Sequence, residues 1–199
     1  MDEVILARHG ESELSLVGTV NGDPTVACGL TETGEQQARR LGERLAHVEI
    51  DLCVTSEFER VRKTADLALA GRDVPRLVLP ELNDVRFGCF EGGALADYRE
   101  WAAANEATAE APGGGESRAA TVLRYALGYR KILARREQTI LVVAHGLPIR
   151  YVLNAIDRVS PMPLAEPVAY GEPNRVSASE LEAAVCLLET WAERPRWNS

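Results

Sequence analysis

The sequence predicts an α/β protein, a three-layer αβα sandwich in which helices cover both faces of a mainly parallel central sheet. Two apolar runs, residues 4–7 and 140–144, have the composition of short buried strands, and each ends on a His-Gly pair. Segments with helical periodicity alternate with the strand-like runs, as they do in α/β folds. Ligands of open α/β sheets bind beyond the carboxyl ends of the strands, so His9 and His145 are the first candidate site residues.

Length and composition indicate an ordinary globular protein. A chain of 199 residues, 46% of them hydrophobic, can bury one core, and we expect a single domain over residues 1–199. The net charge of -8 argues against a general binder of nucleic acid or of anionic membranes. The N-terminus does not resemble a signal peptide, and no apolar run has membrane-spanning length, so we expect a cytoplasmic protein. Cys53 and Cys186 lie in apolar runs and are expected to be free, buried thiols.

The first quarter of the chain predicts loop, helix and strand in turn. A polar loop that contains glycine follows the first His-Gly pair and runs to about residue 29. Thr31 has the character of an N-cap, and the apolar spacing after it predicts a helix to about residue 46. Residues 50–55 then predict a second buried strand.

Ser56 begins the second part of the chain. With Glu59 three residues later it matches a capping box, which predicts a helix with Arg60 in its first turn. The segments that follow are predicted to be a short strand over 77–79, a loop over 81–93, a helix over 94–109, a break at 112–115, a helix over 116–136, the second His-Gly strand, and a helix with Pro148 near its start. Residues 176–182 and 185–191 are expected to be edge strands.

Arg8, His9, Arg60 and His145 suit phosphoryl chemistry if they meet at the carboxyl edge of the sheet. Guanidinium groups offer paired donors that match phosphoryl oxygens. A histidine can attack phosphorus through one ring nitrogen while a hydrogen bond to the other fixes the tautomer. The leaving oxygen also needs a proton, and Asp84 and Glu81 are the candidates for that general acid.

An ordered set of motifs supports this interpretation. The set comprises Arg8-His9-Gly10-Glu11-Ser12, Asn21-Gly22, residues 30–34 with Gln37-Ala38, residues 56–65, residues 82–92, Gly115-Glu116-Ser117 and Ala144-His145-Gly146. The chain resembles the histidine phosphatase superfamily, the phosphoglycerate mutase-like proteins, in these motifs and in their order. The resemblance covers nearly the whole chain and implies the phosphoglycerate mutase-like fold.

The resemblance implies roles for individual residues. It implies that His9 is transiently phosphorylated and that Arg8, Arg60, His145 and Asn21 hold the phosphoryl group. Asp84 stands at the position of the family's proton donor, which is usually a glutamate with one more methylene.

That departure keeps Glu81 and Glu91 as alternatives for the acid. Ser15 stands where many mutase-like members have asparagine, and it joins Glu116 as a candidate for the substrate pocket. Glu116 has the alternative of being only an acid at a helix N-terminus. Tyr98 and Trp101 are at helical spacing and belong either to the core or to the pocket.

The sequence therefore predicts a metal-independent phosphomonoesterase, a histidine acid-type phosphatase, with no cofactor and with a small phosphorylated metabolite as its partner. No cluster of carboxylates, histidines or thiolates has the spacing of metal ligands. The first alternative is a phosphoglycerate mutase. The resemblance implies a longer insertion between the acid and the Gly-Glu-Ser motif in that branch, whereas only residues 85–115 lie there in this chain. The second is a non-catalytic module that binds phosphorylated ligands. A homodimer is left open.

Overall fold

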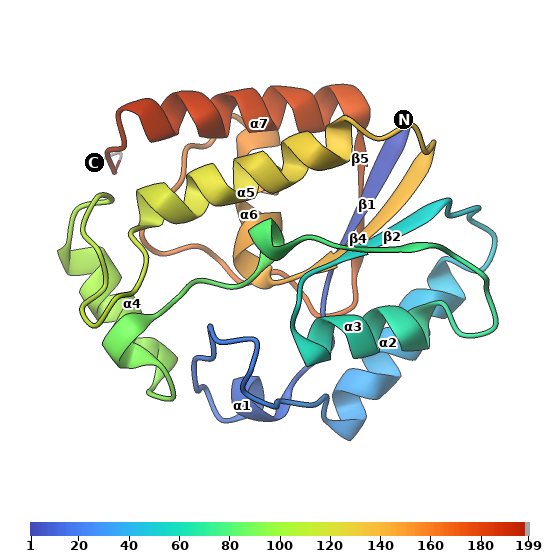
Figure 1. Cartoon of the computed structure of the whole chain (residues 1–199), viewed down its shortest axis with the longest axis horizontal. Coiled ribbons are helices and arrows are strands. Elements are labelled where there is room, and N and C mark those ends of the chain that lie inside the picture. Colours follow the sequence, from blue (N-terminus) through green and yellow to red (C-terminus); the bar gives the residue numbers. More distant parts are fainter. Residues whose placement is uncertain (198–199) are drawn as a thin grey trace.

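A five-stranded sheet lies at the centre of the protein, with the strand order β3-β2-β4-β1-β5. In the computed structural model, which describes residues 1–197, the strands are β1 (Glu3–Arg8), β2 (Leu52–Thr55), β3 (Arg76–Val78), β4 (Thr139–Ala144) and β5 (Pro173–Ser177). The first four are parallel, and β5 runs antiparallel to β1 (Figure 1). The prediction of a mainly parallel sheet is thus confirmed.

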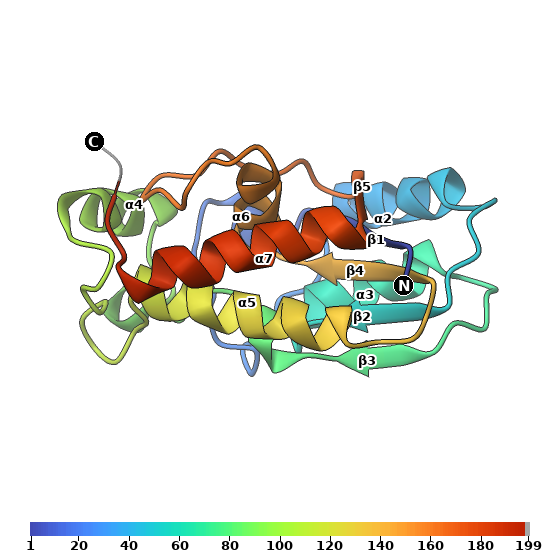
Figure 2. The ribbon, with the colours of Figure 1, turned by 90° about the horizontal axis from the view of Figure 1, so that it is seen from above.

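Helices cover both faces of this sheet. α2 (Glu32–Arg44) and α3 (Glu59–Ala68) pack on one face, while α5 (Arg118–Leu133), α6 (Gly146–Ile156) and α7 (Ala178–Glu193) pack on the other (Figures 1 and 2). Successive residues of a strand point to opposite faces, so Val4 and Leu6 join one core and Ile5 and Ala7 the other. The predicted three-layer αβα sandwich is confirmed.

Several predicted helix boundaries need correction. Thr31 is an N-cap whose side chain accepts a hydrogen bond from Gly34 N, as predicted. The capping box at Ser56 is wrong, because Phe58 is the N-cap of α3 and has no side-chain cap bond. Ser56 Oγ instead lies 2.9 Å from a ring nitrogen of His145.

Two other helices differ from their predicted ranges, and one helix was not predicted. The helix predicted over 94–109 is the shorter α4 (Leu95–Ala104), and the helix predicted over 116–136 begins after the N-cap Ser117. A one-turn helix, α1 (Glu13–Leu16), lies in the segment predicted as loop.

The two predicted C-terminal edge strands are wrong. Only Pro173–Ser177 forms a strand, and Ser177 with Glu180 then makes a capping box that opens the long helix α7. The buried residues Leu181, Ala184, Val185, Leu188 and Trp191 follow helical spacing and face the core. The expectation that Cys186 is buried is also wrong, because it lies on the exposed face of α7, whereas Cys53 is buried.

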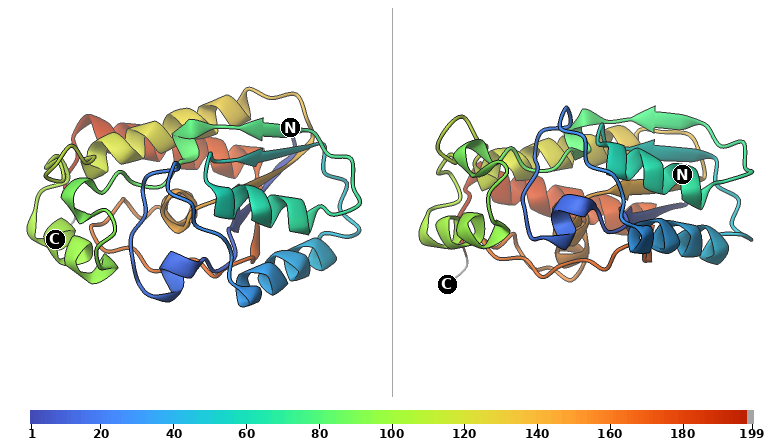
Figure 3. Two further views of the ribbon diagram at one scale, coloured as in Figure 1. Left: turned by 60° about the horizontal axis from the view of Figure 1, so that its bottom comes forward. Right: turned by 90° about the horizontal axis from the view of Figure 1, so that it is seen from below.

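Irregular segments gather beyond the carboxyl ends of the parallel strands. Residues 11–30, the stretch from Pro80 to Ser117 with α4, and residues 157–172 lie at this end of the sheet (Figure 3). Beneath them Val20, Val85, Phe87, Tyr98 and Ala111 form a separate apolar cluster, which supports these segments. In residues 1–197, every helix is too short or too polar to cross a lipid bilayer.

Candidate active site

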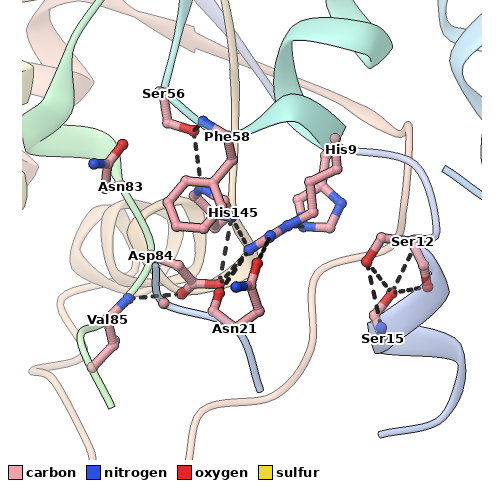
Figure 4. A network of polar contacts seen from close by, with 12 residues as sticks. His9, Ser12, Ser15, Asn21, Ser56, Phe58, Asn83, Asp84, Val85 and His145 are labelled. Atoms are coloured by element: carbon pink, nitrogen blue, oxygen red, sulfur yellow. Dashed lines mark hydrogen bonds and ion pairs between the residues drawn. The ribbon is translucent and has the colours of Figure 1, made fainter. Parts of the chain in front are cut away.

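The two His-Gly motifs meet because their strands are neighbours. In the parallel pair β1 and β4, Arg8 is opposite Ala144, so the two chains leave the sheet side by side. The backbone N–H of His9 donates to Ala144 O over 2.9 Å. The ring centroids of His9 and His145 are 5.3 Å apart, and both rings are buried (Figure 4).

The orientation of the His9 ring fixes its tautomer. Nδ1 lies 2.7 Å from Gly10 O, and because a carbonyl oxygen only accepts hydrogen bonds, Nδ1 carries the proton. Nε2 therefore keeps its lone pair, toward which Arg60 Nε donates over 3.3 Å. Burial, followed by the charges of Arg60 and Arg8, holds the pKa of His9 well below its usual 6.5. His9 is thus neutral near pH 7, and its Nε2 is unprotonated and accepts a long hydrogen bond from Arg60.

Gly10 is required for this geometry by close packing. A Cβ at this position would lie 2.3 Å from Gly34 O, in the first turn of α2. The backbone N–H of Gly10 also donates to Thr64 Oγ1 over 3.0 Å. The glycine thereby ties the end of β1 to α2 and α3 and holds the carbonyl that orients His9.

Arg60 reaches the same point from the first turn of α3. It donates through Nη1 to Asn21 Oδ1 over 2.6 Å, through Nη2 to Asn21 O over 3.1 Å, and through Nη2 to Asp84 Oδ2 over 3.3 Å. Burial lowers the pKa of Arg60, and the carboxylate of Asp84 offsets only part of that shift. These contacts hold a buried guanidinium between His9 and His145.

Arg8 is held by a segment that sequence reasoning did not include in the site. Its Nη1 donates to Val168 O over 2.8 Å and its Nη2 to Tyr170 Oη over 3.0 Å. Its guanidinium carbon also stacks 3.8 Å from the centroid of the Tyr170 ring. Arg8 Nε is buried and has no partner in residues 1–197. Tyr170 stands in an irregular stretch with no periodicity, so the sequence carried no signal for this contact.

His145 is the N-cap residue of α6 and is fully buried. Its Nε2 lies 2.9 Å from Ser56 Oγ, while its Nδ1 lies 3.3 Å from Arg60 Nη2 and 3.4 Å from Asp84 Oδ2. Burial, followed by the nearby cation of Arg60, holds the pKa of His145 well below 6.5. The second ring is therefore also neutral near pH 7.

Of the three acids considered from the sequence, only Asp84 lines the cavity beside His9. Asp84 Oδ1 accepts from Val85 N over 3.0 Å, and its Oδ2 faces Arg60 and His145 (Figure 4). Glu81 instead pairs with Lys131, with Nζ 2.6 Å from Oε1. Glu91 accepts from the backbone N–H groups of Gly22 and Phe87 and holds the loop.

Ser15 lines the cavity, but Glu116 does not. Ser15 Oγ accepts from Ser12 N over 2.8 Å, inside the cap of α1. Glu116 is bound through both oxygens by Arg124, with Nε–Oε1 and Nη2–Oε2 distances of 2.8 and 2.7 Å. Burial alone raises the pKa of Glu116, but the hydrogen bonds and the charge from Arg124 reverse that shift and lower it.

The same Arg124 holds the segment that carries Asp84. Its Nη1 donates to Glu81 O and to Asn83 O over 2.9 and 2.8 Å, and its Nη2 donates to Asp84 O over 3.0 Å. The sequence singled out Glu116 but gave no sign of Arg124, since an arginine inside a helix usually lies in solvent. We call this arrangement of Glu116, Arg124 and the three carbonyls the loop brace.

A cavity with about 1060 Å³ of empty space, partly open to solvent, opens over these groups. Its charged lining consists of Arg8, Arg60, Arg99, Arg118, Arg150, Asp84 and Glu166. Apolar side chains such as Val85, Phe87 and Leu147 line the rest, together with Tyr98 and Tyr170. The candidate residues Asn21 and Ser15 also lie on its wall. No group of three or more His, Cys, Asp or Glu side chains in residues 1–197 is arranged to hold a metal ion.

Known proteins resemble this chain in sequence. The adenosylcobalamin/alpha-ribazole phosphatase of Salmonella typhimurium is 46% identical over 86 residues, which are 43% of this chain and 42% of that relative. The match therefore spans less than half the length of that phosphatase. A 2,3-bisphosphoglycerate-dependent phosphoglycerate mutase of Methylobacterium sp. is 34% identical over 174 residues, which are 77% of this chain and 80% of that relative.

Solved structures and a family model agree with these relatives. The alpha-ribazole phosphatase from Shigella flexneri superposes with a TM-score of 0.73 at 27% identity, covering 87% of this chain and 89% of that chain. A sequence model of the histidine phosphatase superfamily (branch 1) matches residues 4–192. The family expected from the motifs is thus confirmed, and the chain belongs to the histidine phosphatase superfamily.

Proposed function

We propose that this protein is a metal-independent phosphomonoesterase that works through a phosphohistidine on His9. The observation that carries the proposal is the fixed tautomer of His9, with Nδ1–H bound to Gly10 O and the Nε2 lone pair beside Arg60. A histidine that only fills space or caps a strand has no need of an unprotonated Nε2 next to a buried cation. Membership of the histidine phosphatase superfamily supports the same chemistry.

In the proposed first step, His9 Nε2 attacks phosphorus while the bond to the ester oxygen breaks. Arg8, Arg60, His145 and Asn21 would bind the phosphoryl oxygens, and their donors stand in place before the charge develops. Asp84 would give its proton to the leaving oxygen, so that an alcohol departs. Its place on the cavity wall, within 3.4 Å of the His145 ring, supports this role.

In the proposed second step, water attacks the phosphohistidine and the N–P bond breaks. The carboxylate of Asp84 would take a proton from that water, which regenerates the acid and releases inorganic phosphate. We further propose a small phosphorylated metabolite as the substrate, because the cavity is a pocket of modest volume. We also propose a cytoplasmic location, because Cys28, Cys53, Cys89 and Cys186 are free thiols, as is usual in a reducing compartment.

The alternative function is a phosphoglycerate mutase, in which the phosphoryl group returns to the substrate. The 34% identity to a mutase over 77% of this chain favours it. The two activities differ in product, because a phosphatase releases inorganic phosphate, whereas a mutase converts phosphoglycerate isomers without releasing it. A binding module releases nothing and converts nothing.

The test is turnover of a panel of phosphorylated metabolites, with release of inorganic phosphate as the readout. We expect release by the wild type and phosphate trapped on His9 after rapid quenching. His9→Ala should abolish release and labelling. The control is His47→Ala, because His47 is exposed and lies outside the cavity. Full turnover by His9→Ala would overturn the mechanism, and isomerisation without release would favour the mutase.

A further inference from the structure

One buried arginine lines the cavity without a carboxylate partner. Arg118, the first residue of α5, is only 7% exposed, yet it forms part of the cavity wall. Arg60 pairs with Asp84, and the arginine of the loop brace pairs with Glu116. No carboxylate pairs with Arg118 anywhere in residues 1–197. An arginine stays charged in proteins, so its charge has no counter-ion inside the fold.

The surroundings of Arg118 satisfy it only in part. Its Nη1 donates to Tyr151 Oη over 3.4 Å, and its guanidinium carbon lies 5.1 Å from the centroid of the Tyr98 ring. Its Nε is buried without a partner, as is the hydroxyl of Tyr98, another residue of the cavity wall. Within residues 1–197, Nη2 makes no hydrogen bond. It is unfavourable to bury Arg118 Nε and the Tyr98 hydroxyl without partners. Unsatisfied polar groups at a cavity wall are typical of a site that binds a ligand.

Arg8, which is half-buried and lies beside His9, shares two features with Arg118. It pairs with no carboxylate in residues 1–197, its Nε has no partner there, and the proposed function gives it a phosphoryl oxygen. The lining as a whole has five arginines against two acids, Asp84 and Glu166, in a chain with a net charge of -8. The positive charge of the cavity exceeds what one phosphoryl group uses.

We propose that Arg118 is a second anion site, which binds a carboxylate or a further phosphate on the leaving group of the ester. This inference rests on the proposed phosphatase function and narrows its substrates to phosphate monoesters that carry a second anionic group. Arg118 Nη2, which makes no hydrogen bond within residues 1–197, would donate to the anion, and the Tyr98 ring lies against the same guanidinium. Apolar side chains around Arg118 lower the local dielectric constant, which strengthens the attraction between its guanidinium and the anion.

The test compares pairs of substrates that differ by one anionic group. Phosphoserine and phosphoethanolamine differ only by the carboxylate, while propanediol bisphosphate and propanediol monophosphate differ only by a phosphate. We expect the wild type to favour the more anionic member of at least one pair in kcat/KM. Arg118→Met should reduce that preference by about 10- to 100-fold, the range of a hydrogen bond to a charged group. Arg118→Lys should restore part of it.

Two controls separate this role from a structural one. Arg136→Met removes an exposed arginine outside the cavity and should leave the preference unchanged. Because Arg118→Met removes an unpaired buried charge, its Tm should equal or exceed that of the wild type. A lower Tm with an equal loss of kcat/KM on both members of each pair would overturn the proposal in favour of a structural role.

The failure of this proposal is distinguishable from the failure of the proposed function. If the wild type hydrolyses esters but treats both members of each pair alike, the second anion site is wrong and the phosphatase stands. If no ester is hydrolysed, the phosphatase proposal fails, and calorimetric titration with phosphoserine and phosphoethanolamine still decides the site. Tighter binding of phosphoserine that Arg118→Met abolishes would support it, and equal binding would overturn it.

Discussion

Removing the arginine of the loop brace tests how the candidate acid is positioned. Arg124→Met deletes the bonds to Glu81 O, Asn83 O and Asp84 O. It also removes the close ion pair of Glu116, whose side chain is 3% exposed, and leaves only a 3.7 Å contact with the exposed Arg86. Removing one partner of a buried pair costs about 3–5 kcal/mol of unfolding free energy. In a chain of this size, that loss lowers Tm by about 6–20 °C.

The same variant should impair catalysis selectively. Because Asp84 loses the donor that holds its backbone carbonyl, an alkyl phosphate, which needs a proton on its leaving oxygen, should slow more than an activated aryl phosphate. The assay is urea or thermal unfolding together with kcat on the two esters. The matched control is Arg130→Met on the same helix, whose pair with Glu189 lies at the surface and contributes only about 0–1 kcal/mol.

A double-mutant cycle with Glu116→Gln checks the mechanism. Glutamine still accepts the hydrogen bond from Arg86 N, but it carries no buried charge that needs Arg124. The double variant should therefore be more stable than the sum of the single losses predicts, by about 1–3 kcal/mol. An Arg124→Met variant that loses no more stability than Arg130→Met, or that slows both esters equally, would refute the role of the brace.

Three further predictions concern the candidate site. His9 and His145 have folded-state pKa values below 6.5, so below that pH the unfolded chain binds more protons, and the unfolding free energy should fall as pH drops from 7.5 to 5.5. The unfolding free energy changes by at most about 1.4 kcal/mol per pH unit for each histidine. Urea unfolding at several pH values measures this slope, and the double variant His9→Asn, His145→Asn should flatten it. Asp84→Asn should slow an alkyl phosphate by roughly 10²–10⁴-fold and an aryl phosphate much less; selective loss in Glu81→Gln instead would move the acid to Glu81. Activity should survive thorough chelation, since arginines supply the positive charge, and recovery that required an added divalent ion would contradict this.

The sequence by itself determined the four parallel strands and the two histidines at the edge of their sheet. The strands β1 and β4 are buried on both faces, so each is an unbroken run of apolar residues. Such a run predicts a buried strand even when the neighbouring strands are unknown. Because the two strands are parallel, the His-Gly pairs that follow them lie at the same edge of the sheet, beyond the carboxyl ends of the strands. The chemistry of the residues added Arg60 and Asp84, and the ordered motifs added Asn21. The structure brings these groups together around His9 and His145.

The C-terminal helix shows where local pattern failed. Residues 176–182 and 185–191 are rich in side chains that suit either a strand or a buried helix, and they are predicted to be strands from the sequence. Packing of α7 on α5 and α6 decided the matter, because it buries residues at helical spacing along one face. A sequence segment that suits both a helix and a strand adopts the structure that buries its apolar residues against the neighbouring elements.

Only the tertiary structure decided which charges have partners. Tyr170 beneath Arg8, Arg124 behind Asp84 and the unpaired Arg118 all depend on contacts between residues far apart in the chain. Nothing in the local sequence distinguishes an arginine that lies in solvent from one that holds a loop or one that is buried without a partner. Helical and strand periods report burial of a face, whereas the partner of a buried charge is set by how separate elements meet.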